Sequence, residues 1–83
     1  MFYTYVLKSK KYGKWYTGST NNLRKRLKLH NDGKSNYTKK YRPYELMYYE
    51  ACLSEEDARS REKYLKTGMG IRYLKNRVRR SYL

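Results

Sequence analysis

Aromatic and β-branched residues gather in two short runs near the start of the chain. The first, YTYVLKS over residues 3–9, has the composition of a strand. The second, WYTGS over residues 15–19, follows a short loop with one glycine and several lysines, KKYGK over residues 10–14. Because a loop this short can only join antiparallel neighbours, the pattern predicts a β-hairpin.

Beyond residue 19 the spacing of apolar residues changes to that of a helix. Any of the polar residues TNN at 20–22 can cap a helix start, and LRKRLKLHN follows with leucines at helical spacing. Asp32 and Gly33 end this segment, because glycine accepts the left-handed conformation that commonly closes a helix. We therefore expect a basic helix over residues 23–31.

The middle of the chain predicts a loop, a third strand and a second helix. A polar, basic loop over residues 33–43 ends in the only proline, and YELMYYEA over residues 44–51 has the aromatic content of a strand. SEED at residues 54–57 has the spacing of a capping box, which indicates a helix start. This helix should run to about Thr67.

Two glycines separate the second helix from a last one. Gly68 and Gly70 should interrupt the helical pattern. IRYLKNRVRRSYL then predicts a final helix with Ile71, Leu74 and Val78 on one face.

The order of these elements predicts the fold class. No linker or internal repeat appears, so the order β-β-α-β-α-α indicates one α+β domain over residues 1–83. Its core should be a small three-stranded antiparallel sheet flanked by helices.

Charge adds a class of partner to this picture. The 83 residues include 21 Lys and Arg against 7 Asp and Glu, a formal net charge of +14. Such an excess suggests a polyanionic partner, either DNA or RNA. A solubilising surface or a ribosome-associated structural protein would also explain it. Charge alone therefore favours simple nucleic-acid binding over catalysis.

Other classes find little support in the composition. Cys52 is the only cysteine, and no Cys/His cluster offers a zinc site. The start of the chain lacks the pattern of a signal peptide, and no apolar run approaches the length of a membrane span. We expect a cytoplasmic protein with no membrane partner and no small-molecule cofactor. Its oligomeric state is left open.

Polar groups fall on the apolar faces of both predicted central helices. On the first helix, Arg26 and His30 lie beside the apolar leucines. On the second, Glu62 shares a stripe with Ala58 and Leu65. A buried charge must be paired or bound to a metal. One interpretation is a scaffold ion pair of Glu62 with Arg26, Arg61 or Lys66. The other is a functional site.

Tyrosines on the hairpin bear on the choice between a scaffold ion pair and a functional site. Tyr3, Tyr5 and Leu7 share one face of the first strand, and Tyr16 sits on its neighbour. These rings can be plain core residues. In the functional interpretation the hydroxyls of Tyr5 and Tyr16 point into a pocket beside Arg26.

Together, these residues resemble the motifs of the GIY-YIG nuclease superfamily. Residues 4–6, Thr-Tyr-Val, stand in place of the first motif, and residues 16–18, Tyr-Thr-Gly, in place of the second. Arg26 follows ten residues after Tyr16, His30 lies a turn later, and Glu62 matches the superfamily's metal-binding glutamate. The resemblance covers nearly the whole chain.

Other features resemble the small stand-alone members of this superfamily. These are the YTKKYRP stretch and the ELMYYE strand. Departures are Thr4 in place of glycine and Thr17 at the centre of the second motif. A late asparagine of some relatives could correspond to Asn76, across the TGMGI break. We expect no added DNA-binding domain, so the motifs do not indicate the choice of substrate.

The resemblance implies a metal-dependent endonuclease that hydrolyses phosphodiester bonds in DNA, of the structure-selective repair or recombination type. Glu62 would hold Mg²⁺ or Mn²⁺, and Arg26 would grip a phosphate oxygen. Tyr5 or Tyr16 would take a proton from the attacking water, and we favour Tyr5 as base with Tyr16 as its partner. Arg26 and the metal would have to lower the tyrosine pKa. His30 would relay the proton or orient a tyrosine.

Further basic residues are candidates for holding the nucleic-acid backbone without reading its sequence. They are Lys39, Lys40, Arg42, Arg72, Arg77, Arg79 and Arg80. The alternative function is a nucleic-acid-binding module that has this fold but no turnover.

Overall fold

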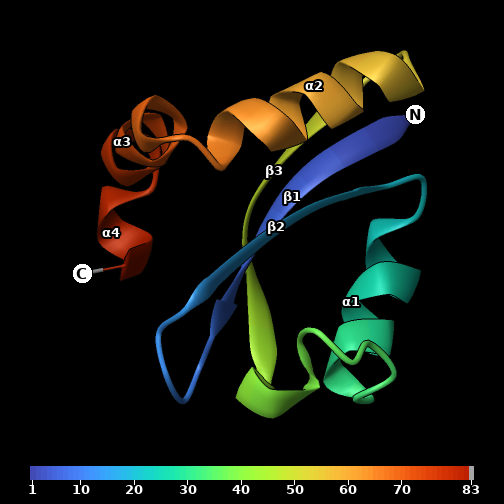
Figure 1. The fold of residues 1–83 in the computed structure, drawn as a ribbon, viewed down its shortest axis with the longest axis vertical. Helices are drawn as coiled ribbons and strands as arrows, with labels where there is room; N and C mark the ends of the chain where they lie inside the picture. Colours follow the sequence, from blue (N-terminus) through green and yellow to red (C-terminus); the bar gives the residue numbers. More distant parts are fainter. Residues whose placement is uncertain (83) are drawn as a thin grey trace.

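The computed structural model describes the chain from residue 1 to residue 82, and side chains as far as residue 80. Three strands, β1 (Phe2–Ser9), β2 (Trp15–Thr20) and β3 (Tyr44–Cys52), form one antiparallel sheet in the order β2-β1-β3. The central strand is β1, and β2 lies at an edge (Figure 1). The predicted hairpin, sheet and α+β class are confirmed.

Helices lie on both sides of this sheet. They are α1 (Leu23–Asn31), the short 3₁₀ helix η1 (Lys39–Tyr41), α2 (Glu55–Leu65), α3 (Gly68–Arg77) and α4 (Arg79–Tyr82). Figure 1 shows α2 running along one side of β1, with α1 on the other side and α3 and α4 at the far end of α2. None of the helices in the described part of the chain has the length and apolar character needed to span a membrane.

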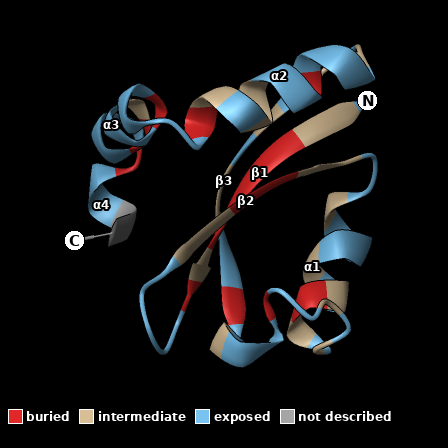
Figure 2. Ribbon diagram, viewed as in Figure 1, coloured by how far each residue is buried: buried red, intermediate tan, exposed pale blue. Residues whose placement is uncertain are grey.

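Alternate residues of β1 supply two separate cores, because successive side chains of a strand point to opposite faces. Tyr5 and Leu7 pack with the half-buried leucines of α1. Val6 points the other way and packs with Leu65 of α2 and Leu74 of α3. Figure 2 shows this burial concentrated along β1, with most of the helical surface exposed.

Helix ends follow the capping residues predicted from the sequence. Asn22 caps α1 by accepting a hydrogen bond from the backbone amide of Lys25. Gly33, just beyond this helix, has φ of +75°, a conformation that suits glycine. Ser54 caps α2 in the same way by accepting from the amides of Glu56 and Asp57.

The prediction that Gly68 and Gly70 interrupt a helix is wrong. The break falls at Lys66 and Thr67, and α3 begins at Gly68 with Thr67 as its cap. Gly70 is buried, and a Cβ atom there would collide with the carbonyl oxygen of Tyr64 and the backbone of Leu65. Its role is therefore to let α3 approach the end of α2 closely.

The apolar face of α3 is also narrower than predicted. Leu74 and Val78 are buried, but Ile71 is 38% exposed. The helix ends at Arg77, where Val78 acts as its C-cap before the short α4.

We expect Gly70→Ala to destabilise the fold by about 1–3 kcal/mol, the usual cost of forcing extra volume into a packed contact. Gly68→Ala is the matched control, because nothing lies within 4 Å of its added methyl group. It should leave the free energy of unfolding unchanged or raise it by up to about 1 kcal/mol. Urea unfolding followed by circular dichroism measures both. Equal stability of the two variants would contradict the packing role of Gly70.

Candidate active site

The site is built around a close contact between the central strand and the edge strand. Tyr5 on β1 lies directly opposite Gly18 on β2. A Cβ atom at position 18 would stand only 2.6 Å from the hydroxyl oxygen of Tyr5 and 3.2 Å from the ring of Tyr16. The glycine therefore leaves the space that the Tyr5 phenol occupies.

A buried hydrogen-bond chain starts at that phenol. Tyr5 Oη lies 3.0 Å from Nε2 of His30, and Nδ1 of His30 lies 2.7 Å from Oγ1 of Thr38. His30 and Thr38 are each 1% exposed. Tyr44 extends the chain by donating its hydroxyl to the carbonyl oxygen of Thr38 at 3.0 Å. Both nitrogens of His30 are thus engaged, so the neutral ring donates from one and accepts at the other.

Aromatic rings surround His30 and lead outward. The ring centroid of Tyr16 lies 5.0 Å from that of His30 and 6.4 Å from that of Tyr5. Tyr16 is only half-buried, and its other neighbour, Tyr37, stands 5.8 Å away in the loop after α1. The path from the buried chain to solvent therefore passes Tyr16.

Burial dominates the electrostatics of Tyr5. Desolvation raises the pKa of Tyr5 well above its ordinary value, and the nearby Tyr16 and Glu62 raise it further, while Arg26 lowers it by less. The sequence motifs imply that Arg26 and a bound metal together lower this pKa, and the charge of Arg26 by itself does not offset the effect of burial. Glu62 and Arg26, from helices on opposite sides of the sheet, both lie within electrostatic reach of the phenol.

His30 is held in its neutral form. Burial, and secondly the positive charge of Arg26, lower the pKa of His30 below its ordinary value of 6.5. At neutral pH the ring can therefore accept a proton, although protonation costs more than in water.

Arg26 lies farther from the core than the helical pattern suggested. It is exposed, and no carboxylate among the described residues forms an ion pair with it. It lines a polar cavity of about 200 Å³, together with Ser19 and Thr20 of β2 and Arg59 of α2. The helical wheel gave the correct direction, but the long side chain carries the guanidinium into solvent beside the site.

Glu62 faces β2 from α2. Its Oε1 accepts a hydrogen bond from the Ser19 hydroxyl at 2.8 Å, and its Oε2 accepts one from Lys66 Nζ at 2.8 Å. Burial alone would raise the pKa of Glu62, but the hydrogen bonds from Lys66 and Ser19 bring it below its ordinary value. The carboxylate is thus ionised and partly accessible, with 24% of its side chain exposed.

This geometry can be compared with that of known proteins. A sequence model of the GIY-YIG catalytic domain matches residues 1–70. The chain belongs to the GIY-YIG family. The family is a nuclease superfamily, so the resemblance drawn from the motifs is confirmed. The matched region contains Tyr5, Tyr16, Arg26, His30 and Glu62.

Relatives of this GIY-YIG chain are small UPF0213 proteins. It is 48% identical over 63 residues to UPF0213 protein YazA of Bacillus subtilis, covering 75% of this chain and 63% of YazA. It is 46% identical over 67 residues to UPF0213 protein CPE1444 of Clostridium perfringens, covering 80% of this chain and 71% of that protein. The chain thus spans just under two thirds of the length of YazA.

A solved structure has the same fold. The solution NMR structure of UPF0213 protein BH0048 from Bacillus halodurans is 35% identical to this chain, with a TM-score of 0.53. The match covers 89% of this chain and 82% of that protein.

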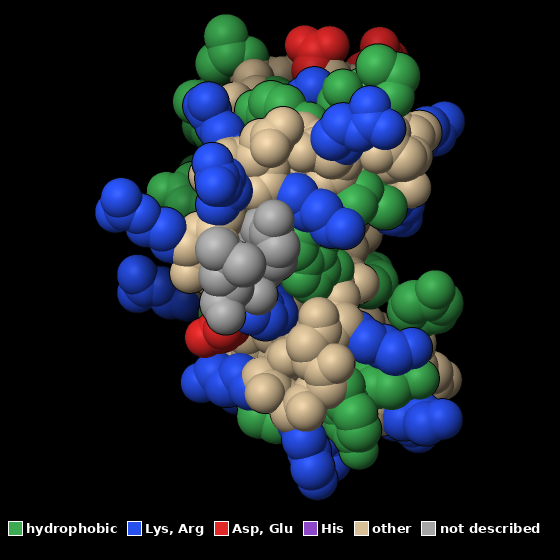
Figure 3. All heavy atoms as spheres, turned by 90° about the vertical axis from the view of Figure 1, so that its left-hand side faces the viewer, with side chains coloured by type: hydrophobic (Ala, Val, Ile, Leu, Met, Phe, Trp, Pro, Cys, Tyr) green, Lys and Arg blue, Asp and Glu red, His purple; other side chains and the backbone are tan. Residues whose placement is uncertain are grey.

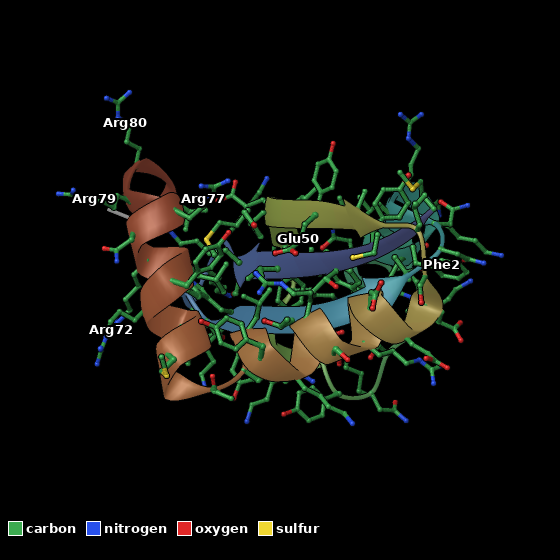
Figure 4. All side chains as sticks on the ribbon, turned by 90° about the horizontal axis from the view of Figure 1, so that it is seen from above. Phe2, Glu50, Arg72, Arg77, Arg79 and Arg80 are labelled. Atoms are coloured by element: carbon green, nitrogen blue, oxygen red, sulfur yellow. The ribbon has the colours of Figure 1, made fainter. Side chains whose placement is uncertain are left out.

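A second polar cluster, missed in the sequence, provides the scaffold ion pair of this GIY-YIG chain. Arg61 of α2 donates to both carboxylate oxygens of Glu50 on β3, at 2.9 and 3.0 Å, and Tyr48 donates to the same carboxylate at 3.0 Å. Tyr73 of α3 lies 3.3 Å from the Tyr48 hydroxyl. In Figure 4 the side chain of Glu50 lies beside β3 and β1. The sequence held one indication of this cluster: Glu50 is two residues from Tyr48, so the two side chains lie on the same face of the strand.

Candidate backbone-binding residues fall into two separate groups. Lys39, Lys40 and Arg42 lie in or beside η1, and the four arginines Arg72, Arg77, Arg79 and Arg80 lie on α3 and α4. All of these side chains are exposed. Figure 4 shows Arg72, Arg79 and Arg80 projecting away from the sheet. Figure 3, which faces α3 and α4, shows lysines and arginines over the full height of this side, with few acids. Asn76 and the four arginines of α3 and α4 lie beyond residues 1–70, the part of the chain that the family model matches.

We expect His30 to titrate below pH 6.5, and Arg26→Ala to raise its pKa because a nearby positive charge is lost. Arg24→Ala is the control, since Arg24 is exposed on the same helix. His30 is the only histidine, so its NMR signals need no assignment. Below pH 6.5 the unfolded chain binds the proton more readily, so the free energy of unfolding should fall as pH decreases. A His30 pKa at or above 6.5 would contradict this environment.

Thr38→Val should remove the partner of His30 Nδ1 while keeping the shape of the side chain. A buried polar group without a partner costs about 1–3 kcal/mol, so stability should fall by that amount. The ¹⁵N shifts of His30 should report a change of tautomer at the same time. Thr38→Ser keeps the hydroxyl and should restore the wild-type tautomer. An unchanged tautomer in the valine variant would show that Thr38 does not orient the ring.

Proposed function

We propose that this GIY-YIG protein is a divalent-metal-dependent endonuclease that hydrolyses phosphodiester bonds in DNA. The observation that carries the proposal is the convergence on β2 of a buried Tyr5–His30 pair from one face of the sheet and an ionised Glu62 from the other. Nucleic-acid binding by itself does not require a buried proton-transfer pair beside an ionised carboxylate. The fold family, a nuclease superfamily, supports the same activity.

The Tyr5–His30 hydrogen bond supports a proton relay. Hydrolysis forms a bond from the water oxygen to phosphorus and breaks the bond from phosphorus to the leaving sugar oxygen. Tyr5 would accept the proton of the water and pass its own proton to Nε2 of His30, 3.0 Å away. Because the two transfers are coupled, this route needs no phenolate beforehand and is compatible with the raised pKa of Tyr5. The leaving oxygen would take a proton from solvent.

Tyr16 is the other candidate base. Only 2% of Tyr5 is exposed, whereas Tyr16 is half-buried and borders solvent. We keep Tyr5 as base with Tyr16 as its partner, because, of these two tyrosines, only Tyr5 is hydrogen-bonded to His30 in the described structure. In the reverse assignment Tyr16 would take the proton from the water, and the Tyr5–His30 pair would position Tyr16.

Arg26 would bind a nonbridging phosphate oxygen. An exposed guanidinium without an acidic partner among the described residues is available to an anion, and its planar fork suits phosphate. Lys39, Lys40, Arg42 and the arginines of α3 and α4 would hold more distant phosphates. Such contacts make binding strongly dependent on salt.

A cation such as Mg²⁺ or Mn²⁺ fits the donor set at Glu62. No group of three or more His, Cys, Asp or Glu gathers within the described residues, so Glu62 would supply a single carboxylate. Mg²⁺ commonly binds through one or two carboxylates, several waters and substrate phosphate. Ser19 and Lys66 each use one lone pair, and a carboxylate offers about four. When bound, the cation would supply neutralisation of charge on the leaving oxygen.

We expect the purified protein to cleave DNA in the presence of Mg²⁺ or Mn²⁺. Branched, single-stranded and duplex substrates should be compared, because the fold does not set the preferred structure. Glu62→Gln and Arg26→Ala should each reduce the cleavage rate by more than about a hundredfold while binding survives. Tyr5→Phe should cost about 10²–10⁴-fold if Tyr5 transfers the proton.

Arg24→Ala is the matched control for Arg26→Ala and should retain activity. Cleavage that is unchanged in Glu62→Gln and Arg26→Ala would identify a contaminating nuclease. Binding without cleavage under any condition would favour the nucleic-acid-binding module. A larger loss in Tyr16→Phe than in Tyr5→Phe would reverse the assignment of the base.

A further inference from the structure

A cavity beside the candidate active site has no role in the proposed chemistry. It is a cleft of about 460 Å³ along the outer side of β2, lined by Trp15 and Tyr16 of the strand, Tyr37 of the following loop, and Lys66 and Ile71 from the α2–α3 region. Its volume lies in the range of about 300–1,000 Å³ that is typical of small-molecule sites. The walls are mostly apolar, and a cationic side chain lies among them.

Tyr37 is the most unusual member of this lining. It is 81% exposed, although its ring stands 5.8 Å from that of Tyr16. It makes no contribution to the two buried cores. A large aromatic ring held at the surface beside another ring is a stacking platform that is left open on one side.

Position in the fold makes this cleft continuous with the catalytic residues. Tyr16 lines the cleft and contacts the ring of His30. Lys66 also lines it and donates to the carboxylate of Glu62 at 2.8 Å. A phosphate beside Glu62 and Arg26 would therefore have its adjoining nucleoside at the mouth of the cleft.

The chemistry of the lining matches a nucleotide. Planar bases stack on aromatic rings, and the attached phosphate is attracted to nearby cations. The net charge of +14 favours a polyanionic ligand over a neutral apolar one. A further hollow of about 370 Å³ shares Trp15, Tyr16 and Tyr37 and continues past Lys14, so the surface has room for the chain to proceed.

We propose that this cleft is a binding subsite for one nucleobase, unpaired at that position, of the strand whose phosphodiester lies at Arg26 and Glu62. Tyr37 stacks on the base, the ring of Tyr16, tilted by 53° from that of Tyr37, contacts its edge, Ile71 closes the opposite wall, and Lys66 faces the adjoining phosphate. The subsite rests on the proposed function for the location of the phosphate. Base binding is measured without cleavage, so the two proposals fail independently.

The fluorescence of Trp15 reports directly on the subsite. Trp15 is the only tryptophan, and it lines the cleft. Without divalent metal and at one fixed salt concentration, a short oligothymidylate should change its emission as it binds. An abasic deoxyribose-phosphate oligomer of the same length should bind more weakly and leave the emission unchanged, because charge alone attracts it.

Tyr37→Ala tests the stacking role, and Tyr49→Ala is the matched control. Tyr49 is 53% exposed on β3, and its ring pairs with that of Tyr3 at 6.0 Å, away from the cleft. Tyr37→Ala should weaken the affinity for the base-bearing oligomer about five- to 150-fold, which is the range for the loss of one base–aromatic stack. It should leave the affinity of the abasic oligomer unchanged, and Tyr49→Ala should change neither.

Two outcomes would overturn the base subsite. One is equal affinity and equal Trp15 emission change with the base-bearing and abasic oligomers. The other is an equal loss of affinity for both in Tyr37→Ala, which would mean that Tyr37 acts through the backbone or the fold. If the protein binds the base as described but never cleaves, the subsite is supported and the nuclease proposal is contradicted. If it cleaves but binds both oligomers equally, the nuclease proposal is supported and the subsite is contradicted.

Discussion

The site depends on one close approach, that of the Tyr5 phenol to the backbone of Gly18. Because the two residues lie directly opposite each other, a side chain at position 18 would occupy the space of the phenol. With glycine there, Tyr5 stays 98% covered and still reaches His30. A phenol buried without that partner would cost about 1–3 kcal/mol. The same contact therefore stabilises the sheet and sets the distance between the two groups proposed to move a proton.

The edge position of β2 explains how groups from both faces of the sheet can serve one ligand. Successive residues of a strand point to opposite faces, so Tyr16 lies on the side of His30 while Ser19 reaches Glu62 of α2. On a central strand these two sets would be separated by neighbouring strands. At an edge, a ligand can contact both by lying along the strand. The order β2-β1-β3 is thus a requirement of the proposed site as well as a feature of the fold.

Local signals in the sequence predicted most of the fold, because capping residues and periodicity act over a few positions. Asn22 and the bounds of α1 are examples. The wheel also identified the direction of Arg26 and Glu62, but an angle about a helix axis does not give depth, so the exposure of Arg26 was missed. The scaffold ion pair joins Glu50 to Arg61 across two elements. The spacing of residues along the chain does not indicate which carboxylate Arg61 will pair with.

Because Arg61 pairs with Glu50, Glu62 is left with a weaker partner, and this difference supports a functional role for Glu62. Arg61 binds Glu50 with two hydrogen bonds in a partly buried position, whereas Glu62 is paired with Lys66, whose side chain is 54% exposed. The two carboxylates are similarly exposed, at 23% for Glu50 and 24% for Glu62, but Lys66 makes one hydrogen bond from an exposed position where Arg61 makes two. A pair four residues apart on a helix with one exposed partner contributes little, about 0.3–0.5 kcal/mol when both partners are exposed. Lys66 can then leave Glu62 at small cost when a cation approaches the carboxylate, and its ammonium group can turn to a phosphate in the adjoining cleft. A weak pair at this position is therefore what a functional carboxylate requires, and a strong one would hinder it.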